Sequence, residues 1–318
     1  MYKDDLFTAN DITAANISKI SKKQSEIEEQ RICEISELAE EAADFAMRMI
    51  EEGYGIYEVL SFIAEGIFGL DTTVHSHSMP ENSDRLISYL KITTAYDRIV
   101  FSELFAEKIR SRGIILSETE FLPSFSGDES FTYVKNPLAD EAYDVFSQEF
   151  SNPRLRYSKN FSDAAKSVAD GEFEYALLPL EERGGARLSA VAALLFRDDL
   201  KINSVTPVFG FEGLADMKYA LVSKHFTVPE FREDDDRYLE IRMRADSSIP
   251  LSEIFAAADS LGCTLYRINT ISFDTEDGAV QYYSVVFRDM GKDFTLLLVF
   301  LTVFSGAYIP VGIYKNLE

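Results

Sequence analysis

The sequence predicts a multidomain chain that combines α+β and α/β architecture: an N-terminal helical bundle, a single central α/β lobe and a C-terminal βαββαβ sandwich. Three observations predict this. Apolar residues recur at helical spacing through the first 115 residues, two continuous apolar runs of strand length follow, and strand-type alternation dominates the last part of the chain. We expect domains at residues 1–115, 116–228 and 229–318.

Helices are expected throughout the first domain. An apolar stripe runs from Ile17 to Met49, and Gly53 and Gly55 follow it as a stop. Two further helices are expected over residues 57–67 and 84–112, the second ending at Gly113.

The central lobe is predicted from two apolar runs, residues 173–180 and 218–223, which have no polar alternation. Strands of this kind are covered by helices on both faces, so we expect them to be buried neighbours in one sheet. Glu182 and Met217 are 217 − 182 = 35 residues apart, enough for one helix and one strand.

The third domain is predicted from six segments in the order strand, helix, strand, strand, helix, strand. This is the split βαβ pattern of a two-layer sandwich. The segments are residues 237–244, 250–262, 264–273, 280–287, 294–304 and 308–314.

The helix predicted over residues 294–304 is apolar nearly all round. A helix that covers a lone sandwich should have a polar side, so a further element must cover this one. The candidates are the preceding α/β lobe and a second copy of the same domain. A symmetric dimer is the common solution for a self-complementary patch, and we expect a homodimer with this domain in its interface.

Composition narrows the class of protein. A formal net charge of −23 opposes binding to nucleic acid or to an anionic membrane. Cys33 and Cys263 lie far apart, the N-terminus is acidic, and no apolar run is long enough to span a bilayer, so we expect a cytoplasmic protein. The pair His75 and His77 is expected to be a solvated loop, and no metal site or cofactor is predicted.

The order of elements in the third domain, with its closing Val311-Gly-Ile-Tyr314, resembles the ACT domain. In that family the domain binds amino acids at subunit interfaces and regulates an attached enzyme. The resemblance places an effector site at Ile249, Pro250, Leu251, Asn269 and Thr270, where dehydratases with this domain have Gly-Ala-Leu and Glu-Ser-Arg-Pro. Pro250 lacks an amide that could hold a ligand carboxylate, whereas Asn269 and Thr270 can still hydrogen-bond an amino group.

The central lobe resembles prephenate dehydratase, whose members end in an ACT domain. The resemblance rests on Gly171-Glu-Phe-Glu-Tyr-Ala-Leu-Leu-Pro-Leu-Glu-Glu-Arg-Gly-Gly185 and Asp216-Met-Lys-Tyr-Ala-Leu-Val222. It implies a ligand site at Glu181, Glu182, Arg183, Gly184 and Lys218. The N-terminal helices occupy the place of a chorismate mutase domain in bifunctional enzymes, a match of position only.

Departures from the family pattern oppose catalysis. The family's threonine proton donor is Met217 here, and its Asn-Ser pair is Glu182-Arg183. A thioether cannot donate the proton that expulsion of a hydroxyl requires. The family also inserts a second lobe between these segments, which this chain has no length to form, so the site is expected to face water.

Two functions remain open. One is a catalytically silent, dehydratase-like protein with a regulatory or assembly role in aromatic amino-acid metabolism, phenylalanine biosynthesis in particular, with an amino acid and a partner enzyme as candidate partners. The other is an active prephenate dehydratase with a rebuilt site, in which Lys218, Glu181 or Glu182 supplies the proton.

Overall fold

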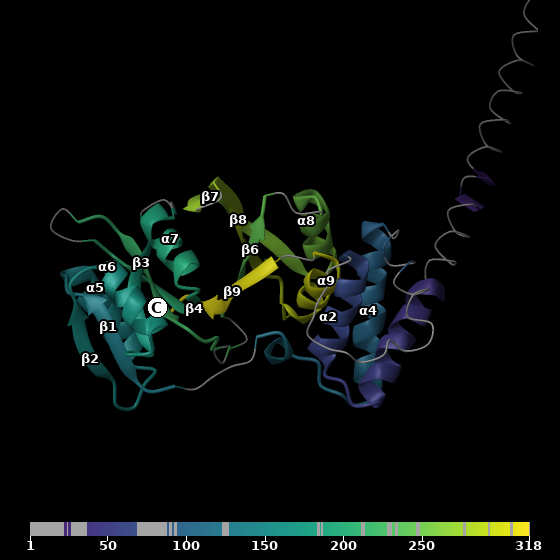
Figure 1. Cartoon of the computed structure of the whole chain (residues 1–318), viewed down its shortest axis with the longest axis horizontal. Coiled ribbons are helices and arrows are strands. Elements are labelled where there is room, and N and C mark those ends of the chain that lie inside the picture. Colours follow the sequence, from purple (N-terminus) through teal and green to yellow (C-terminus); the bar gives the residue numbers. More distant parts are fainter. Residues whose placement is uncertain are drawn as a thin grey trace, which may run out of the picture.

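The structure is a computed structural model and contains two β-sheets with helices between and beside them (Figure 1). It describes residues 22–23, 25–26, 37–68, 88, 91, 94–122, 127–182, 185, 187–210, 214–227, 231–232, 235–245, 249–275, 278–291, 293–305 and 308–317. In these residues no helix combines the length and the apolar composition that crossing a bilayer requires.

The first sheet has five strands in the order β2-β1-β3-β5-β4. Strands β1, β2 and β3 run parallel, and β5 is antiparallel to both β3 and β4. We call these strands and their helices the first module. Its elements are β1 (Ser130–Val134), α5 (Pro137–Ser147), β2 (Arg154–Ser158), α6 (Phe161–Ala169), β3 (Tyr175–Glu182), α7 (Ser189–Arg197), β4 (Lys201–Val208) and β5 (Met217–Ser223).

The prediction that the two apolar runs are neighbouring buried strands is confirmed, because β3 pairs with β5 along its length. Helices cover both faces: α5 packs on one side, and α6 and α7 on the other. Between β3 and β5 the described chain forms one helix, α7, and one strand, β4. Asparagine caps fix two of these helices, since Asn136 and Asn160 accept hydrogen bonds from Ala139 N and Asp163 N at 2.9 and 2.8 Å.

The second sheet has four antiparallel strands in the order β7-β8-β6-β9. The predicted β-α-β-β-α-β order is confirmed. We call this part the second module, with elements β6 (Arg237–Arg244), α8 (Leu251–Ser260), β7 (Cys263–Thr275), β8 (Gly278–Asp289), α9 (Thr295–Phe304) and β9 (Tyr308–Lys315).

The N-terminal helices form a third group: a helix over residues 37–51, α2 (Ile56–Phe68) and α4 (Ala95–Ser111). Gly53 and Gly113 end two of them with φ of +104° and +73°, which glycine adopts without strain. The expectation of one unbroken helix over residues 84–112 is wrong. Thr94 has an extended backbone and is the N-cap of α4, and its amide donates to Asp97 Oδ2 at 2.7 Å.

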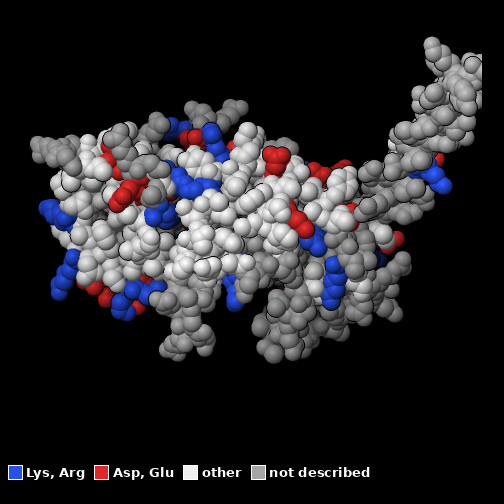
Figure 2. All heavy atoms as spheres, turned by 90° about the horizontal axis from the view of Figure 1, so that it is seen from above, with Lys and Arg blue, Asp and Glu red and all other residues white. Residues whose placement is uncertain are grey.

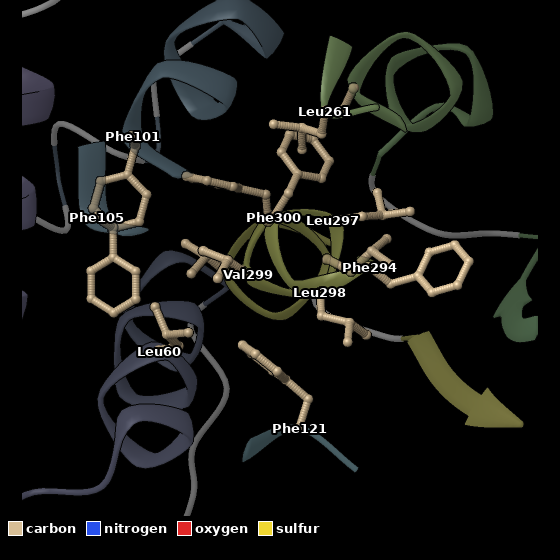
Figure 3. Close-up of a cluster of buried hydrophobic side chains, with 14 of the residues drawn as sticks. Leu60, Phe101, Phe105, Phe121, Leu261, Phe294, Leu297, Leu298, Val299 and Phe300 are labelled. Carbon is tan, nitrogen blue, oxygen red and sulfur yellow. The ribbon is translucent and has the colours of Figure 1, made fainter. Parts of the chain in front are cut away.

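Helix α9 lies at the centre of the main hydrophobic core (Figure 3). The prediction that a further element covers this helix is confirmed, but neither named candidate is that element, because its outer side packs against α2 and α4 of the same chain. Leu60 of α2 and Phe101 and Phe105 of α4 surround it, and the rings of Phe101 and Phe304 meet edge to face at 5.9 Å. Leu298 is fully buried by this packing. The homodimer stays a prediction. The argument that a second copy is needed to cover α9 no longer supports it, because the chain covers α9 itself.

The face of the second sheet opposite α8 and α9 packs against the first module. Tyr238, Val286 and Tyr314 share a core with α6, α7, β3 and β4. At Gly312 the two backbones approach so closely that a Cβ would lie 2.0 Å from the carbonyl oxygen of Ile202. The second sheet is therefore enclosed between the first module and its own helices.

Candidate functional site

A cleft of about 400 Å³ lies between the first sheet and strand β7 of the second module. It opens where β3 and β4 end, and a ligand commonly binds beyond the carboxyl ends of the strands in an α/β sheet. The volume is within the usual range for small-molecule sites. The lining residues are Glu181, Glu182, Gly185, Pro207, Val208, Phe209, Asp216, Met217, Lys218, Tyr266 and Arg267.

Glu181 is the centre of an ion cluster at the base of this cleft. Its side chain is buried and is hydrogen-bonded by Arg267, with Lys218 Nζ at 3.8 Å and an Arg187 nitrogen at 3.9 Å. Burial alone would raise the pKa of Glu181. The hydrogen bond from Arg267 and the charges of Arg187 and Lys218 outweigh it and hold the pKa below its usual range. Glu181 is therefore a carboxylate at neutral pH and has no proton to donate.

Lys218 also lines the cleft, and its side chain is 23% exposed. Burial lowers its pKa, the negative charge of Glu181 opposes this, and Arg267 and Arg187 lower it further. Its Nζ is an ion-pair neighbour of Glu181 but lies beyond hydrogen-bond length, and no other described residue accepts a hydrogen bond from it. The ammonium therefore has donors to offer to a ligand.

The predicted ligand residues are only partly described. Glu181, Glu182 and Lys218 line the cleft together, as does Met217, the residue that the sequence resemblance aligned with a dehydratase proton donor. Arg183 and Gly184 lie outside the described residues. Glu182 is exposed and pairs with no described cation, so the burial that would favour it as a proton donor is not found.

The expectation that the site has no opposing wall is wrong. Strand β7 supplies one, with Tyr266 and Arg267 lining the cleft across from Lys218. Gly185, at φ +83°, lies against the Arg267 guanidinium, where an added Cβ would approach its terminal nitrogen to 3.0 Å. The ion pair between Arg267 and Glu181 joins residues 267 − 181 = 86 positions apart, so no local pattern could have indicated it.

A buried polar cluster behind the cleft joins the two modules. Glu240 on β6 accepts hydrogen bonds from Arg187 at 2.5 Å, Ser284 Oγ at 2.9 Å and Tyr314 Oη at 3.1 Å. The carboxylate and guanidinium side chains are each only 4% exposed. Burial and the charge of Glu240 raise the pKa of Tyr314 well above its ordinary value, so the phenol remains a donor. Arg187 pairs with Glu240 in this cluster and also lies beside Glu181, so the cluster holds the base of the cleft in place.

Charge is mixed on the surface as well. On the face seen in Figure 2, acidic and basic side chains lie close together, with a broad uncharged area over the middle of the molecule. The net charge of −23 therefore does not make this face uniformly acidic.

The predicted effector residues do not gather on one face of the second sheet. Ile249 is buried in the core beside α8, and Pro250 is the N-cap of that helix, which begins one residue later than expected. Asn269 pairs with Ser284 on the face toward the first module, whereas Thr270 is exposed and lies on the opposite face by strand alternation. The effector site remains a prediction.

Comparison with known proteins gives distant structural similarity only. No family model matches the sequence, and no curated protein matches it. Among solved structures, a prephenate dehydratase from Streptococcus mutans is 14% identical, with a TM-score of 0.47 over 59% of this chain and 99% of that chain. A prephenate dehydratase from Arthrobacter aurescens in complex with L-Phe is 14% identical, with a TM-score of 0.44 over 58% of this chain and 89% of that one.

A third similar structure, GqqA, is described as a novel type of quorum quenching acylase. It is 15% identical, with a TM-score of 0.43 over 59% of this chain and 96% of that chain. All three scores are below 0.5, so the function of this chain is inferred from its own residues.

Proposed function

We propose that this chain is a divergent, dehydratase-like protein that has lost catalysis and binds a small ligand in its cleft, in a regulatory or assembly role linked to aromatic amino-acid metabolism. The sequence motifs and the ACT-like order of the second module support the metabolic link. In this proposal the second module stands opposite the first, where a dehydratase has a second lobe.

The observation that carries the proposal is that the family's proton-donor position and both glutamates of the described cleft are unsuited to the role of acid. Met217 has no proton to donate, Glu181 is held as a carboxylate by three cations, and Glu182 is exposed. Dehydration of prephenate needs a donor within hydrogen-bond reach of the departing hydroxyl.

Lys218 favours the alternative, an active prephenate dehydratase with a rebuilt site. Its lowered pKa and its free donors are properties of lysines that transfer protons. In this reading the ammonium would protonate the leaving hydroxyl as carbon dioxide departs.

Phenylpyruvate formation from prephenate separates the two functions. We expect the purified protein to show no rate above the spontaneous reaction. Turnover that is lost in Lys218→Met, while the melting temperature of the variant is unchanged, would establish the alternative. Lys166→Met is the matched control, since this lysine lies on α6 and its side chain is 69% exposed.

A further inference from the structure

The cleft presents charges of both signs together with apolar side chains. Two cations, Lys218 and Arg267, and three carboxylates, Glu181, Glu182 and Asp216, line its described part. We propose that the ligand is a zwitterion, a free α-amino acid with a large apolar side chain. This deepens the proposed function and rests on its assignment of the cleft as a ligand site.

The carboxylate of the amino acid would bind at Lys218 and Arg267. The lysine ammonium has three N–H donors, none of which a described residue satisfies. The guanidinium reaches Glu181 through one terminal nitrogen and leaves donors on its other nitrogens. A ligand carboxylate is a suitable acceptor for both, and partial burial strengthens such a contact relative to one in open water.

The ammonium group would bind at Glu182. This carboxylate lines the same cleft as Lys218. Glu182 pairs with Met217 and Glu181 with Lys218, so Glu182 and Lys218 leave β3 and β5 on opposite faces of the sheet and reach the cleft around the open end of these strands. Asp216 adds a further carboxylate to the lining.

Apolar residues supply the rest of the lining. Phe209 is 71% exposed and Tyr266 is 44% exposed, so both offer apolar surface to a ligand in the cleft. Met217 and Val208 extend the same lining. An amino acid with an aliphatic or aromatic side chain would cover this surface.

Other charge types fit less well. A dianion would meet three carboxylates against two cations, and a monocation would place no group at Lys218 and Arg267. A zwitterion leaves the charge balance of the cleft unchanged.

Isothermal titration of the full chain with L-leucine and L-phenylalanine tests the proposal. Two analogues of leucine accompany them: 4-methylpentanoate, which lacks the amine, and 3-methylbutylamine, which lacks the carboxylate. We expect an amino acid to bind, and each analogue to bind at least about tenfold more weakly than leucine.

Variants assign each end of the ligand. Glu182→Gln should weaken leucine binding about tenfold and leave 4-methylpentanoate unaffected, whereas Lys218→Met should weaken both ligands. Glu141→Gln and Lys166→Met are matched controls on exposed helix surfaces and should change neither. Far-ultraviolet circular dichroism confirms that each variant is folded.

Three results would overturn the amino-acid proposal. They are binding of 4-methylpentanoate as tight as that of leucine, failure of every amino acid tested to bind, and an unchanged leucine affinity in both cleft variants. The first leaves the cleft as a ligand site for a simple anion. None of them bears on catalytic silence, which prephenate turnover tests separately.

Discussion

Arg187 and Glu240 form a buried ion pair between the two modules, and removing one partner should be strongly destabilising. Both side chains are 4% exposed, and their closest nitrogen and oxygen are 2.5 Å apart. In Arg187→Met, the Glu240 carboxylate keeps the hydroxyl donors of Ser284 and Tyr314 but loses its cation. Breaking a buried pair in this way costs about 3–5 kcal/mol, because a desolvated charge remains without its partner.

Urea unfolding followed by circular dichroism measures this cost. The control is Arg154→Met, whose partner is Asp128 and in whose pair both side chains are more than 60% exposed. Such a surface pair contributes less than about 1 kcal/mol. The double variant Arg187→Met/Glu240→Met should lose less than the sum of its single variants, since no lone charge is left buried. A loss below about 1 kcal/mol in Arg187→Met would refute this account of the interface.

Three further predictions concern the cleft, the contact between the sheets and the core. The pKa of Glu181 is lowered in the folded state, so its ionised form stabilises the fold fully above the ordinary value of 4.5, and this stabilisation is lost as the pH falls below that value. The free energy of unfolding of Glu181→Gln should therefore fall less steeply in acid than that of the unchanged protein. Gly312→Ala should lower the free energy of unfolding by about 1–3 kcal/mol, since its Cβ would clash with the Ile202 carbonyl. Phe101→Ala, at a site 1% exposed against α9, should cost about 3–5 kcal/mol, whereas Tyr96→Ala on the same helix, 53% exposed, should cost far less.

Urea unfolding checks all three, repeated at several pH values for the glutamate variant. Gly55→Ala is the control for Gly312, because a Cβ there meets only ordinary contacts near 3.9 Å. Parallel acid profiles for Glu181→Gln and the unchanged protein, a neutral effect at Gly312, or equal losses at the two aromatic sites would each contradict the corresponding reasoning.

Local sequence patterns predicted the second module well. Strand β6 runs over Arg237–Arg244, the residues whose alternation indicated it. The alternation distinguishes an apolar face against the helices from a more polar face toward the first module, although both faces are buried. The same patterns missed the break at Thr94, where an N-cap interrupts a stripe that continues on both sides. The apolar character of α9 showed that a cover was needed but could not identify α2 and α4, since burial specifies no partner.

The candidate site shows the same limit. Motif similarity placed Glu181, Glu182 and Lys218 together, and they do line one cleft. Arg267 was missed because it comes from another module and lies within an ordinary alternating strand. The contact between Arg267 and Glu181 joins residues far apart in the sequence, so it depends on how the two modules dock. Local propensity does not encode that docking.

The docking of the two sheets also bears on how the chain is made. Residues 316 and 317 lie along β4: Asn316 pairs with Val205, Leu317 N donates to the Val205 carbonyl at 2.7 Å, and Thr206 Oγ1 donates to the Leu317 carbonyl at 2.9 Å. Thr206 and Leu317 are 111 residues apart. At ribosomal rates of about 5–20 residues per second, Leu317 is synthesised roughly 6–22 seconds after Thr206, and until then the edge of β4 lacks this pairing. A newly made first module therefore presents an open strand edge during translation, when a chaperone or a neighbouring nascent chain can reach it.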